Sequence, residues 1–295
     1  MQHASQITTM HLSHFSCRDT DFHVSELRDL STTENPFLHR PHQNDFYQLI
    51  LYTRGQGKHQ IDFNTFNYHP STLFAIARGQ VQVMDCLAGT DACILSFAEQ
   101  FLYRCENEMQ WLHQLHLFDL QRENRAIVLD ETDFQQLIML VDHMKSEFQA
   151  KQSLMKLDIL RDLLRVFINH SERLVQNDDR PVRDNDYDLY CCFRKILDAN
   201  YQSCRSVKEY ADMLCITPKK LNQLTLKFTD KHAKKIIEER LFMEIKRVLL
   251  YTNINVTQIA LENGFNDPTN FVKFFKRFAQ TTPSKYRFTL QNGAF

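Results

Sequence analysis

The side chains whose spacing could do chemistry are concentrated in residues 252–287. A helical pattern over 256–260 ends at Gly264, and glycine can adopt the left-handed conformation needed just past a helix end. Asp267 and Pro268 then start a second helix, because Asp caps a helix and Pro fits its first position. Two short helices joined in this way form a helix-turn-helix, which presents its second helix to the DNA major groove.

The second helix of this pair has two chemically different faces. Phe271, Phe275 and Phe278 recur on one face, which predicts that this face is buried. The opposite face carries Thr269, Asn270, Lys273, Lys276 and Arg277. Asn can pair with adenine, and Lys can reach guanine or phosphate. We therefore expect the first three to contact base edges and the last two to contact phosphates.

An upstream segment has the same organisation. A helix starting at Thr217 and Pro218 is expected to bury Leu221, Leu224 and Phe228. Its outer face carries Lys219, Lys220, Asn222, Gln223 and Lys227. We expect the two amides to contact bases and the three lysines to contact phosphates.

A long helical pattern over 233–251 lies between the two segments. A helix of about 19 residues spans roughly 28 Å at 1.5 Å per residue. Half a recognition helix at each end brings the separation close to one turn of DNA, about 34 Å. The two recognition helices could therefore enter successive major grooves.

These segments resemble the C-terminal region of AraC/XylS-type transcription regulators. The resemblance to the second helix-turn-helix rests on Ile259-Ala260, Gly264-Phe265, Asp267, Phe271, Phe275-Lys276, Thr282-Pro283-Ser284 and Tyr286-Arg287. The resemblance to the first rests on Ser206-Val207, Tyr210-Ala211, Leu214, Ile216 and Thr217-Pro218. It implies a DNA-binding domain over 191–295, with helix-turn-helix units at about 206–228 and 256–278. We also expect Arg287 to contact phosphate, and Arg240, which matches an Arg common in the family, to be structural.

The chain departs from the family pattern at three positions. Asp230 and Gln280 stand where the family usually has Gly, and Ile245 stands where it usually has Ala. Asp and Gln adopt a left-handed turn less easily than Gly, so the geometry of these two loops is left open. The larger Ile245 implies compensated packing.

Charge is unevenly distributed along the chain. Residues 190–295 contain 18 basic and 9 acidic residues, whereas residues 1–189 contain 17 basic and 27 acidic residues. Such asymmetry is expected when only one half meets phosphates, and double-stranded DNA is the expected partner. The eight cysteines form no C-x-x-C pair, which suits a reducing cytoplasm. We expect a cytoplasmic protein with no signal peptide and no membrane span.

The N-terminal part reads as short strands separated by Gly and Pro turns. The apolar run at 46–52 ends in a turn at Gly55 and Gly57, and further turns are expected at Pro70 and Gly79. This pattern predicts an antiparallel barrel or jelly roll. Residues 42–101 also resemble the cupin-like sensor domain that precedes many AraC-type DNA-binding regions. The expected fold is thus α+β and multidomain, with a cupin-like barrel over 1–130 and an all-α C-terminal domain.

Helical periodicity begins after Asp130. Two amphipathic helices are expected within 131–175. They could pack on the barrel alone, but we favour a share in a homodimer interface, because the family's sensor domains commonly dimerise through such helices. The charged segment 176–190, interrupted by Pro181, is expected to be a linker.

A small-molecule effector pocket is expected inside the barrel. The candidate lining residues are His42, Tyr47, Arg54, His59 and Tyr68. These side chains could equally fill the core or the surface. If Arg54 faces inward, an anionic or sugar-like effector would suit it.

A metal-dependent cupin enzyme fused to a DNA-binding domain is the main alternative. Such a site needs several His and a carboxylate converging on one ion. The histidines are instead spread over the strands, and Gln82 stands where a ligating His would be expected. We therefore expect no metal, no cofactor and no catalytic site. The favoured function is an AraC-type, effector-controlled transcription regulator that contacts RNA polymerase if it activates, and an effector-independent DNA-binding protein remains a third possibility.

Overall fold

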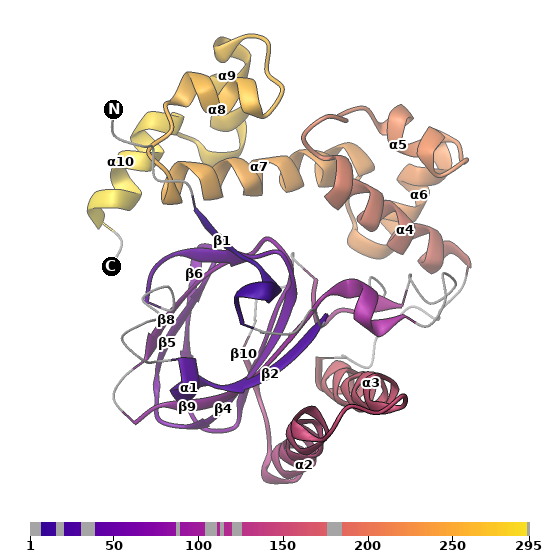
Figure 1. Ribbon diagram of the computed structural model, residues 1–295. Coiled ribbons are helices and arrows are strands. Elements are labelled where there is room, and N and C mark those ends of the chain that lie inside the picture. The colour runs from indigo at the N-terminus through magenta and orange to yellow at the C-terminus, as the bar shows by residue number, and fades with distance from the viewer. Residues whose placement is uncertain are drawn as a thin grey trace. The chain divides into compact units, whose positions relative to one another are not determined.

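The chain folds into two compact units, one over 8–179 and the other comprising mainly 180–295. The first contains the strands and a helical hairpin, and the second is helical (Figure 1). The α+β multidomain fold expected from the sequence is therefore confirmed. The computed structural model describes residues 7–15, 21–30, 39–86, 89–103, 111–112, 115–119, 126–175 and 185–293.

The described strands form two five-stranded sheets rather than one closed barrel. The first sheet has the order β1 (Thr8–Met10), β3 (His42–Asn44), β8 (Val81–Cys86), β5 (Gly57–Ile61), β6 (Asn64–Tyr68). The second has the order β10 (Ala126–Val128), β7 (Thr72–Ile76), β4 (Tyr47–Arg54), β9 (Asp91–Phe97), β2 (Phe22–Glu26). The described strands pair antiparallel, except β1 with β3, which pair parallel.

Strand β4 is apolar on both faces because both are covered. Leu49 and Leu51 belong to the core that includes the helical hairpin. Ile50 and Tyr52 point the other way and pack between the two sheets. Successive side chains of a strand alternate in this way, so neighbouring residues of β4 serve different cores.

The helical hairpin consists of α2 (Glu131–Gln149) and α3 (Lys156–Val175). The Asp130 side chain caps α2 by accepting a hydrogen bond from the Asp133 amide at 2.8 Å. Buried residues from both helices, such as Val141 and Leu164, join the outer core of the second sheet. The hairpin therefore closes one face of the strand domain.

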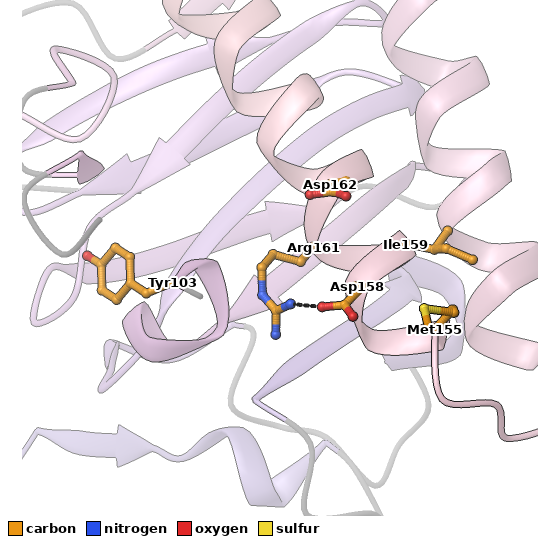
Figure 2. Close-up of a pocket in the computed structure, with 6 residues that line it drawn as sticks. All are labelled: Tyr103, Met155, Asp158, Ile159, Arg161 and Asp162. Carbon is orange, nitrogen blue, oxygen red and sulfur yellow. Dashed lines mark hydrogen bonds and ion pairs between the residues drawn. The ribbon is translucent and has the colours of Figure 1, made fainter. Parts of the chain in front are cut away.

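A surface hollow lies beside the start of α3 (Figure 2). It is lined by Tyr103, Met155, Asp158, Ile159, Arg161 and Asp162. Arg161 forms an ion pair with Asp158 and donates a hydrogen bond to the Phe101 carbonyl at 2.6 Å. The guanidinium of Arg161 is thus paired with groups of the protein itself, whereas the Met155 side chain is exposed.

A buried carboxylate ties α3 to the segment around His116 and Leu117, which precedes β10. Glu172 is only 4% exposed and accepts hydrogen bonds from the amides of His116 and Leu117 at 3.1 and 2.9 Å. Burial alone would raise the pKa of the Glu172 carboxyl, but the hydrogen bonds from His116 and Leu117 outweigh it and lower the pKa. The charged form is therefore stabilised by folding.

Replacing Glu172 by Gln should lower stability at neutral pH and matter less in acid. Because folding depresses this pKa, its contribution is present above the unfolded pKa of about 4.3 and is lost as pH falls through the folded pKa. Urea unfolding of wild type and E172Q at pH 7, 5 and 3.5 measures the difference. Glu147→Gln, on half-buried helix surface, is the matched control. A difference that did not shrink in acid would contradict this role.

The helical unit is organised around α7 (Ala233–Tyr251), which runs between two clusters of shorter helices (Figure 1). At its start lie α4 (Asn185–Asn200), α5 (Val207–Met213) and α6 (Pro218–Thr229). At its end lie α8 (Val256–Glu262), α9 (Pro268–Ala279) and α10 (Pro283–Gly293). Each cluster has its own hydrophobic core against α7.

The predicted linker over 176–190 is only partly within the described residues. Residues 176–184 lie outside them, and residues 185–190 form the first turns of α4. The reason is burial: the rings of Tyr187 and Tyr190 lie 5.4 and 5.2 Å from that of Phe228. Across the described chain, every helix is too short or too polar to cross a bilayer.

Candidate nucleic-acid interface

The two helix pairs start and stop by the same local chemistry. Thr217 caps α6 by accepting from the Lys220 amide at 3.1 Å, and Asp267 caps α9 by accepting from the Thr269 amide at 2.7 Å. Each helix has Pro in its first turn. These are the N-terminal signals of a helix, placed where each recognition helix must begin.

The inner face of α9 is aromatic and largely buried, with Phe278 half-buried at its C-terminal end. Phe271 and Phe275 are both 0% exposed. The Phe275 ring lies 5.2 Å from Phe242 of α7 and 5.3 Å from Tyr286 of α10. These contacts fix the helix on α7 and determine which side of it faces outward.

The outer face of α9 is polar and basic. Each of the residues expected there is exposed, namely Thr269, Asn270, Lys273, Lys276 and Arg277. Arg277 also forms an ion pair with Glu238 of α7 at 2.8 Å and lies over the rings of Phe274 and Phe278. The face therefore offers hydroxyl, amide and ammonium groups, with Arg277 held toward α7.

The outer face of α6 is divided between surface and internal contacts. Lys219 and Gln223 are exposed. Lys220 and Lys227 instead reach Asp186 of α4 at 2.6 and 3.3 Å. The two Asp186 contacts hold α4 against α6, so these lysines can reach a phosphate only by giving up that pair.

Asn222 does not present a free amide. Its Nδ2 donates to the Pro218 carbonyl at 3.1 Å, and its Oδ1 accepts from the Ala233 amide at 3.0 Å. The side chain thus supplies an acceptor for the first turn of α7. Helical periodicity placed Asn222 on the outer face but could not reveal this partner 11 positions later in the chain.

Arg287 also has an internal role. It is half-buried, and its Nε donates to the Leu249 carbonyl near the end of α7 at 3.0 Å. Burial lowers the pKa of its guanidinium. The expected phosphate contact is therefore not favoured, because this side chain joins α10 to α7.

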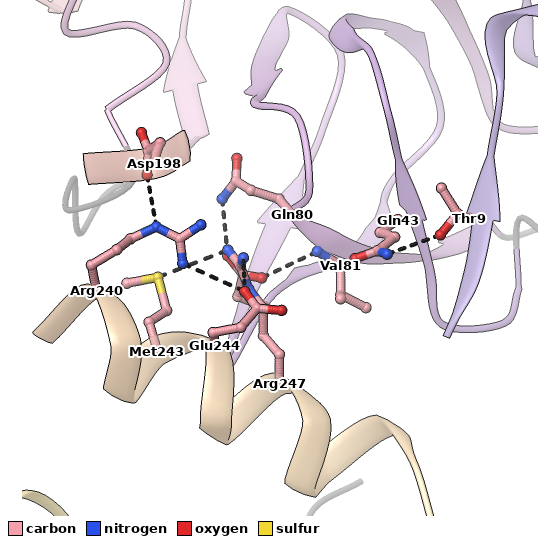
Figure 3. Close-up of polar contacts among 10 residues, drawn as sticks. Thr9, Gln43, Gln80, Val81, Asp198, Arg240, Met243, Glu244 and Arg247 are labelled. Carbon is pink, nitrogen blue, oxygen red and sulfur yellow. Dashed lines mark hydrogen bonds and ion pairs between the residues drawn. The ribbon is translucent and has the colours of Figure 1, made fainter. Parts of the chain in front are cut away.

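Helix α7 carries an ion-pair network on the side that contacts α4 (Figure 3). Arg240 Nε donates to Asp198 at 2.7 Å, and its Nη1 reaches Glu244 at 3.4 Å. The guanidinium also lies 3.9 Å from the ring centre of Tyr201. These contacts agree with the structural role expected for Arg240.

The two helix C-caps that lack the family's usual Gly still adopt the left-handed backbone conformation that Gly favours. Asp230 and Gln280 end α6 and α9 in the left-handed conformation, with φ of 55° and 56°. Cys215, in the turn between α5 and α6, is also left-handed, with φ of 54°. The corresponding turn between α8 and α9 has Gly264. Ile245 is fully buried in the core between α7 and α9.

Replacing Gln280 by Gly should stabilise the helical unit by about 0.5–1 kcal/mol, because Gly adopts this conformation without the cost that a Cβ brings. Calorimetric unfolding measures the effect. Gln280→Ala is the matched control and should leave stability nearly unchanged, since Ala retains the Cβ. A Gly variant less stable than the Ala variant would rule out strain at this cap.

The residues predicted for an effector pocket are not all brought together. His42, His59 and Tyr68 are buried on the first sheet. Tyr47, on β4 of the second sheet, points away from the space between the sheets and packs against Phe97 and Phe118, with ring centres 5.7 and 5.0 Å away.

Arg54 is exposed at the end of its strand, where its Nε donates to the Gly89 carbonyl at 3.2 Å. The inward orientation considered for Arg54 is wrong, because β4 ends at this residue and leaves it at the rim.

The space between the sheets contains a chain of neutral polar side chains that sequence reasoning missed. Asn44 donates to Gln48 at 2.8 Å, and Gln82 also donates to Gln48 at 2.8 Å. The Gln82 carbonyl oxygen and the Tyr52 hydroxyl lie 3.0 and 3.3 Å from the two ring nitrogens of His59. The alternation of β4, which puts 48, 50 and 52 on one face, was the signal that could have found it.

This network is uncharged at neutral pH. Burial lowers the pKa of His59 to about 4, and His42 nearby adds to the effect, although the hydrogen bond to Gln82 opposes it. Asn44 is 1% exposed, and its Oδ1 has no hydrogen-bond partner among the described residues. No group of three or more His, Cys, Asp or Glu within the described ranges could hold a metal ion.

Two family models match the two units. An AraC-like ligand binding domain matches residues 30–157, and a helix-turn-helix domain matches residues 210–288. The chain belongs to the AraC family of transcription regulators. The two-domain fold and the helix-turn-helix motifs expected from the resemblance are thereby confirmed for this AraC-family chain.

Similar proteins include an uncharacterized HTH-type transcriptional regulator of Staphylococcus aureus strain MSSA476, 26% identical over 121 residues. That match covers 40% of this chain, which spans only 15% of the length of this relative. ToxT from Vibrio cholerae is similar at 10% identity and a TM-score of 0.40, over 91% of this chain and 98% of that one. The C-terminal domain of the response regulator yesN from Fusobacterium nucleatum is 24% identical, with a TM-score of 0.31 and coverage of 32% and 94%.

Proposed function

We propose that this chain binds double-stranded DNA sequence-specifically through α6 and α9 and regulates transcription. The observation that supports this most directly is α9, whose aromatic face is buried while its polar face is exposed. Thr269, Asn270 and Lys273 would contact base edges there, with Lys276 and Arg277 on phosphates. On α6, Gln223 would contact a base and Lys219 a phosphate, and Asn222 is left to its contact with α7.

Selection of bound duplexes from a random DNA library tests this proposal. The full-length protein should enrich two sequence elements separated by about one helical turn, since α7 spaces the recognition helices by that order. Gel-shift titration of the enriched duplex against a scrambled duplex then gives the specificity ratio. Equal affinity for both duplexes would reject sequence-specific binding.

The chain is further proposed to form a homodimer through α3. Ile159 and Val166 of α3 are 42% and 43% exposed, and Met155, in the turn just before the helix, is 62% exposed. These apolar side chains lie at helical spacing and form an exposed stripe. A second copy would cover this stripe. Sedimentation velocity should show a dimer that Val166→Asp dissociates, whereas the exposed Asn169→Asp should not. A monomeric wild-type protein would rule out the interface.

The proposed effector is a neutral, hydrogen-bonding small molecule held between the sheets. The exposed Arg54 removes the reason to expect an anion. The neutral network of Gln48, Gln82 and His59 instead suits hydroxyl groups, and the unpartnered Asn44 Oδ1 could accept a hydrogen bond from one. Binding would shift which arrangement of the dimer is populated.

A thermal-shift screen separates this effector class from others. Neutral polyols and sugars should raise the melting temperature of the wild-type protein, and Gln82→Leu should abolish the rise. A rise with aliphatic carboxylates alone would overturn the proposed class. No shift and no change in DNA affinity with any compound would favour an effector-independent regulator.

The same proposal assigns no catalytic role to the strand domain. Two of its buried histidines form hydrogen bonds to neighbouring neutral groups: His59 with Gln82 at 3.0 Å and His42 with the Arg40 carbonyl at 2.9 Å. Elemental analysis of the purified protein tests the alternative of a metal-dependent enzyme, which stoichiometric zinc, iron or manganese would support. With DNA as the proposed partner, the chain would act in the cytoplasm beside the genome, and RNA polymerase would be a further partner if it activates transcription.

A further inference from the structure

The turn of the second helix-turn-helix contacts the segment that enters the first. Arg205 lies directly before Ser206, the N-cap of α5. Its guanidinium carbon lies 3.9 Å from the ring centre of Phe265, and its Nη2 donates to the Asn263 carbonyl. Asn263 and Phe265 belong to the turn between α8 and α9. One side chain thus joins both DNA-binding motifs.

Arg205 is itself held in place from both sides. Its backbone amide donates to the Glu209 carboxylate of α5 at 3.2 Å, and its carbonyl accepts from Lys234 of α7 at 3.0 Å. The side chain is half-buried, and burial lowers its pKa. A stacked, hydrogen-bonded Arg with a fixed backbone is a rigid connector, because its planar group loses little further freedom on contact.

The two motifs also approach each other at the level of the backbone. A Cβ built on Gly264 would lie 3.2 Å from the Gln202 carbonyl oxygen and 3.4 Å from Arg205 Nη2. Gly264 therefore serves two needs, a left-handed turn with φ of 71° and a close approach to residues 202–205. The approach confines the turn of the second motif to one position against the first.

The connecting helix by itself leaves orientation open. Helix α7 sets the distance between the two clusters, but each motif is joined to it through a short loop, at 230–232 and 252–255. Tyr201 packs against both hydrophobic cores and stacks on Arg240 of α7, which adds a second contact. Arg205 acts on the turn that precedes α9, where it opposes rotation of the second motif about α7.

We propose that Arg205 is a positioning residue that fixes the orientation of α9 relative to α6, and so sets the spacing between the two DNA elements that the chain accepts. This inference rests on the proposed function of the two helices. One inserted base pair moves an element by about 3.4 Å and turns it by about 35° around the duplex. A braced pair of helices cannot follow both changes, whereas a loosened pair can.

Spacing variants of the selected operator test the proposal. Full-length wild-type protein is titrated against the operator and against duplexes with one base pair inserted or removed between the elements. We expect wild type to prefer the selected spacing by about tenfold or more, equivalent to about 1.4 kcal/mol. Arg205→Ala should reduce that preference to about threefold or less, with little change in affinity for a duplex that contains one element.

Two further variants separate positioning from loss of charge or fold. Lys208→Ala removes a positive charge from the exposed surface of α5 and should retain the wild-type spacing preference. Phe265→Leu keeps an apolar side chain but removes the stacking partner, and should relax spacing as Arg205→Ala does. Thermal unfolding confirms that each variant is folded at the assay temperature.

The outcomes are distinct. If wild type selects no operator, the proposed function fails and not merely this inference. If wild type binds an operator and both Arg205→Ala and Phe265→Leu keep the full spacing preference, the positioning role of Arg205 is wrong. If Arg205→Ala weakens binding equally at every spacing, as a lost phosphate contact would, the positioning role is wrong too.

Discussion

Replacing Lys273 by Ala should weaken binding to the selected operator by about 1–3 kcal/mol, the usual worth of one good base contact. Affinity for a scrambled duplex should change much less. The reason is position: Lys273 is exposed on the face of α9 opposite the buried Phe271 and Phe275. Gel-shift titration of both duplexes at several salt concentrations measures the two affinities. Asn270→Ala should behave in the same way.

Lys276→Ala is the matched control for this experiment. A phosphate contact positions the protein without reading sequence, so both duplexes should lose affinity equally. The slope of log affinity against log salt should also become shallower, by about one unit for one lost contact. If Lys273→Ala left operator affinity intact, the assignment of this helix face would be wrong.

Replacing Phe275 by Ala should destabilise the second helix-turn-helix by about 3–5 kcal/mol, the usual cost of truncating a fully buried Phe. Its ring contacts Phe242 of α7 and Tyr286 of α10, so the cavity would open at the centre of that core. The core around α6 contains none of these residues. Sequence discrimination should therefore vanish at the element read by α9 and persist at the element read by α6.

Calorimetry and binding to operators mutated in either element measure this prediction. Phe288→Ala is the matched control, because Phe288 is 69% exposed on α10 and its truncation should cost little. Loss of discrimination at both elements together would contradict two separately stabilised cores. Little effect of Phe275→Ala on stability would contradict its place at the centre of the second.

Local signals were sufficient to predict the DNA-binding motifs. Caps such as Thr217 and Asp267, each followed by Pro, act within one turn of helix, so the sequence shows them directly. Periodicity also predicted the buried Phe271 and Phe275. It could not predict the roles of Asn222 and Arg287, because their partners, Ala233 and the Leu249 carbonyl, come from other helices.

The strand domain was harder to predict for the same physical reason. Which face of β4 meets which core depends on pairing with β7 and β9, which lie far along the chain. A shift of one residue exchanges the two faces, so Tyr47 and Tyr52 could not be told apart by composition. The order of strands in two sheets, and the parallel pairing of β1 with β3, likewise depend on contacts between distant segments.

The shared construction of α6 and α9 has a consequence for the promoter. Both helices have 12 residues, begin with Pro and end at a left-handed residue, yet their outer faces differ, with Lys219 and Gln223 on one and Asn270 and Lys273 on the other. A palindrome reads the same in both directions, but two unlike helices in a fixed order along one polypeptide do not. In the proposed complex, the stretch of DNA that one chain occupies therefore has a direction. Turning that stretch end for end would turn the bound protein with it, and would present a different side of the regulator to the gene downstream.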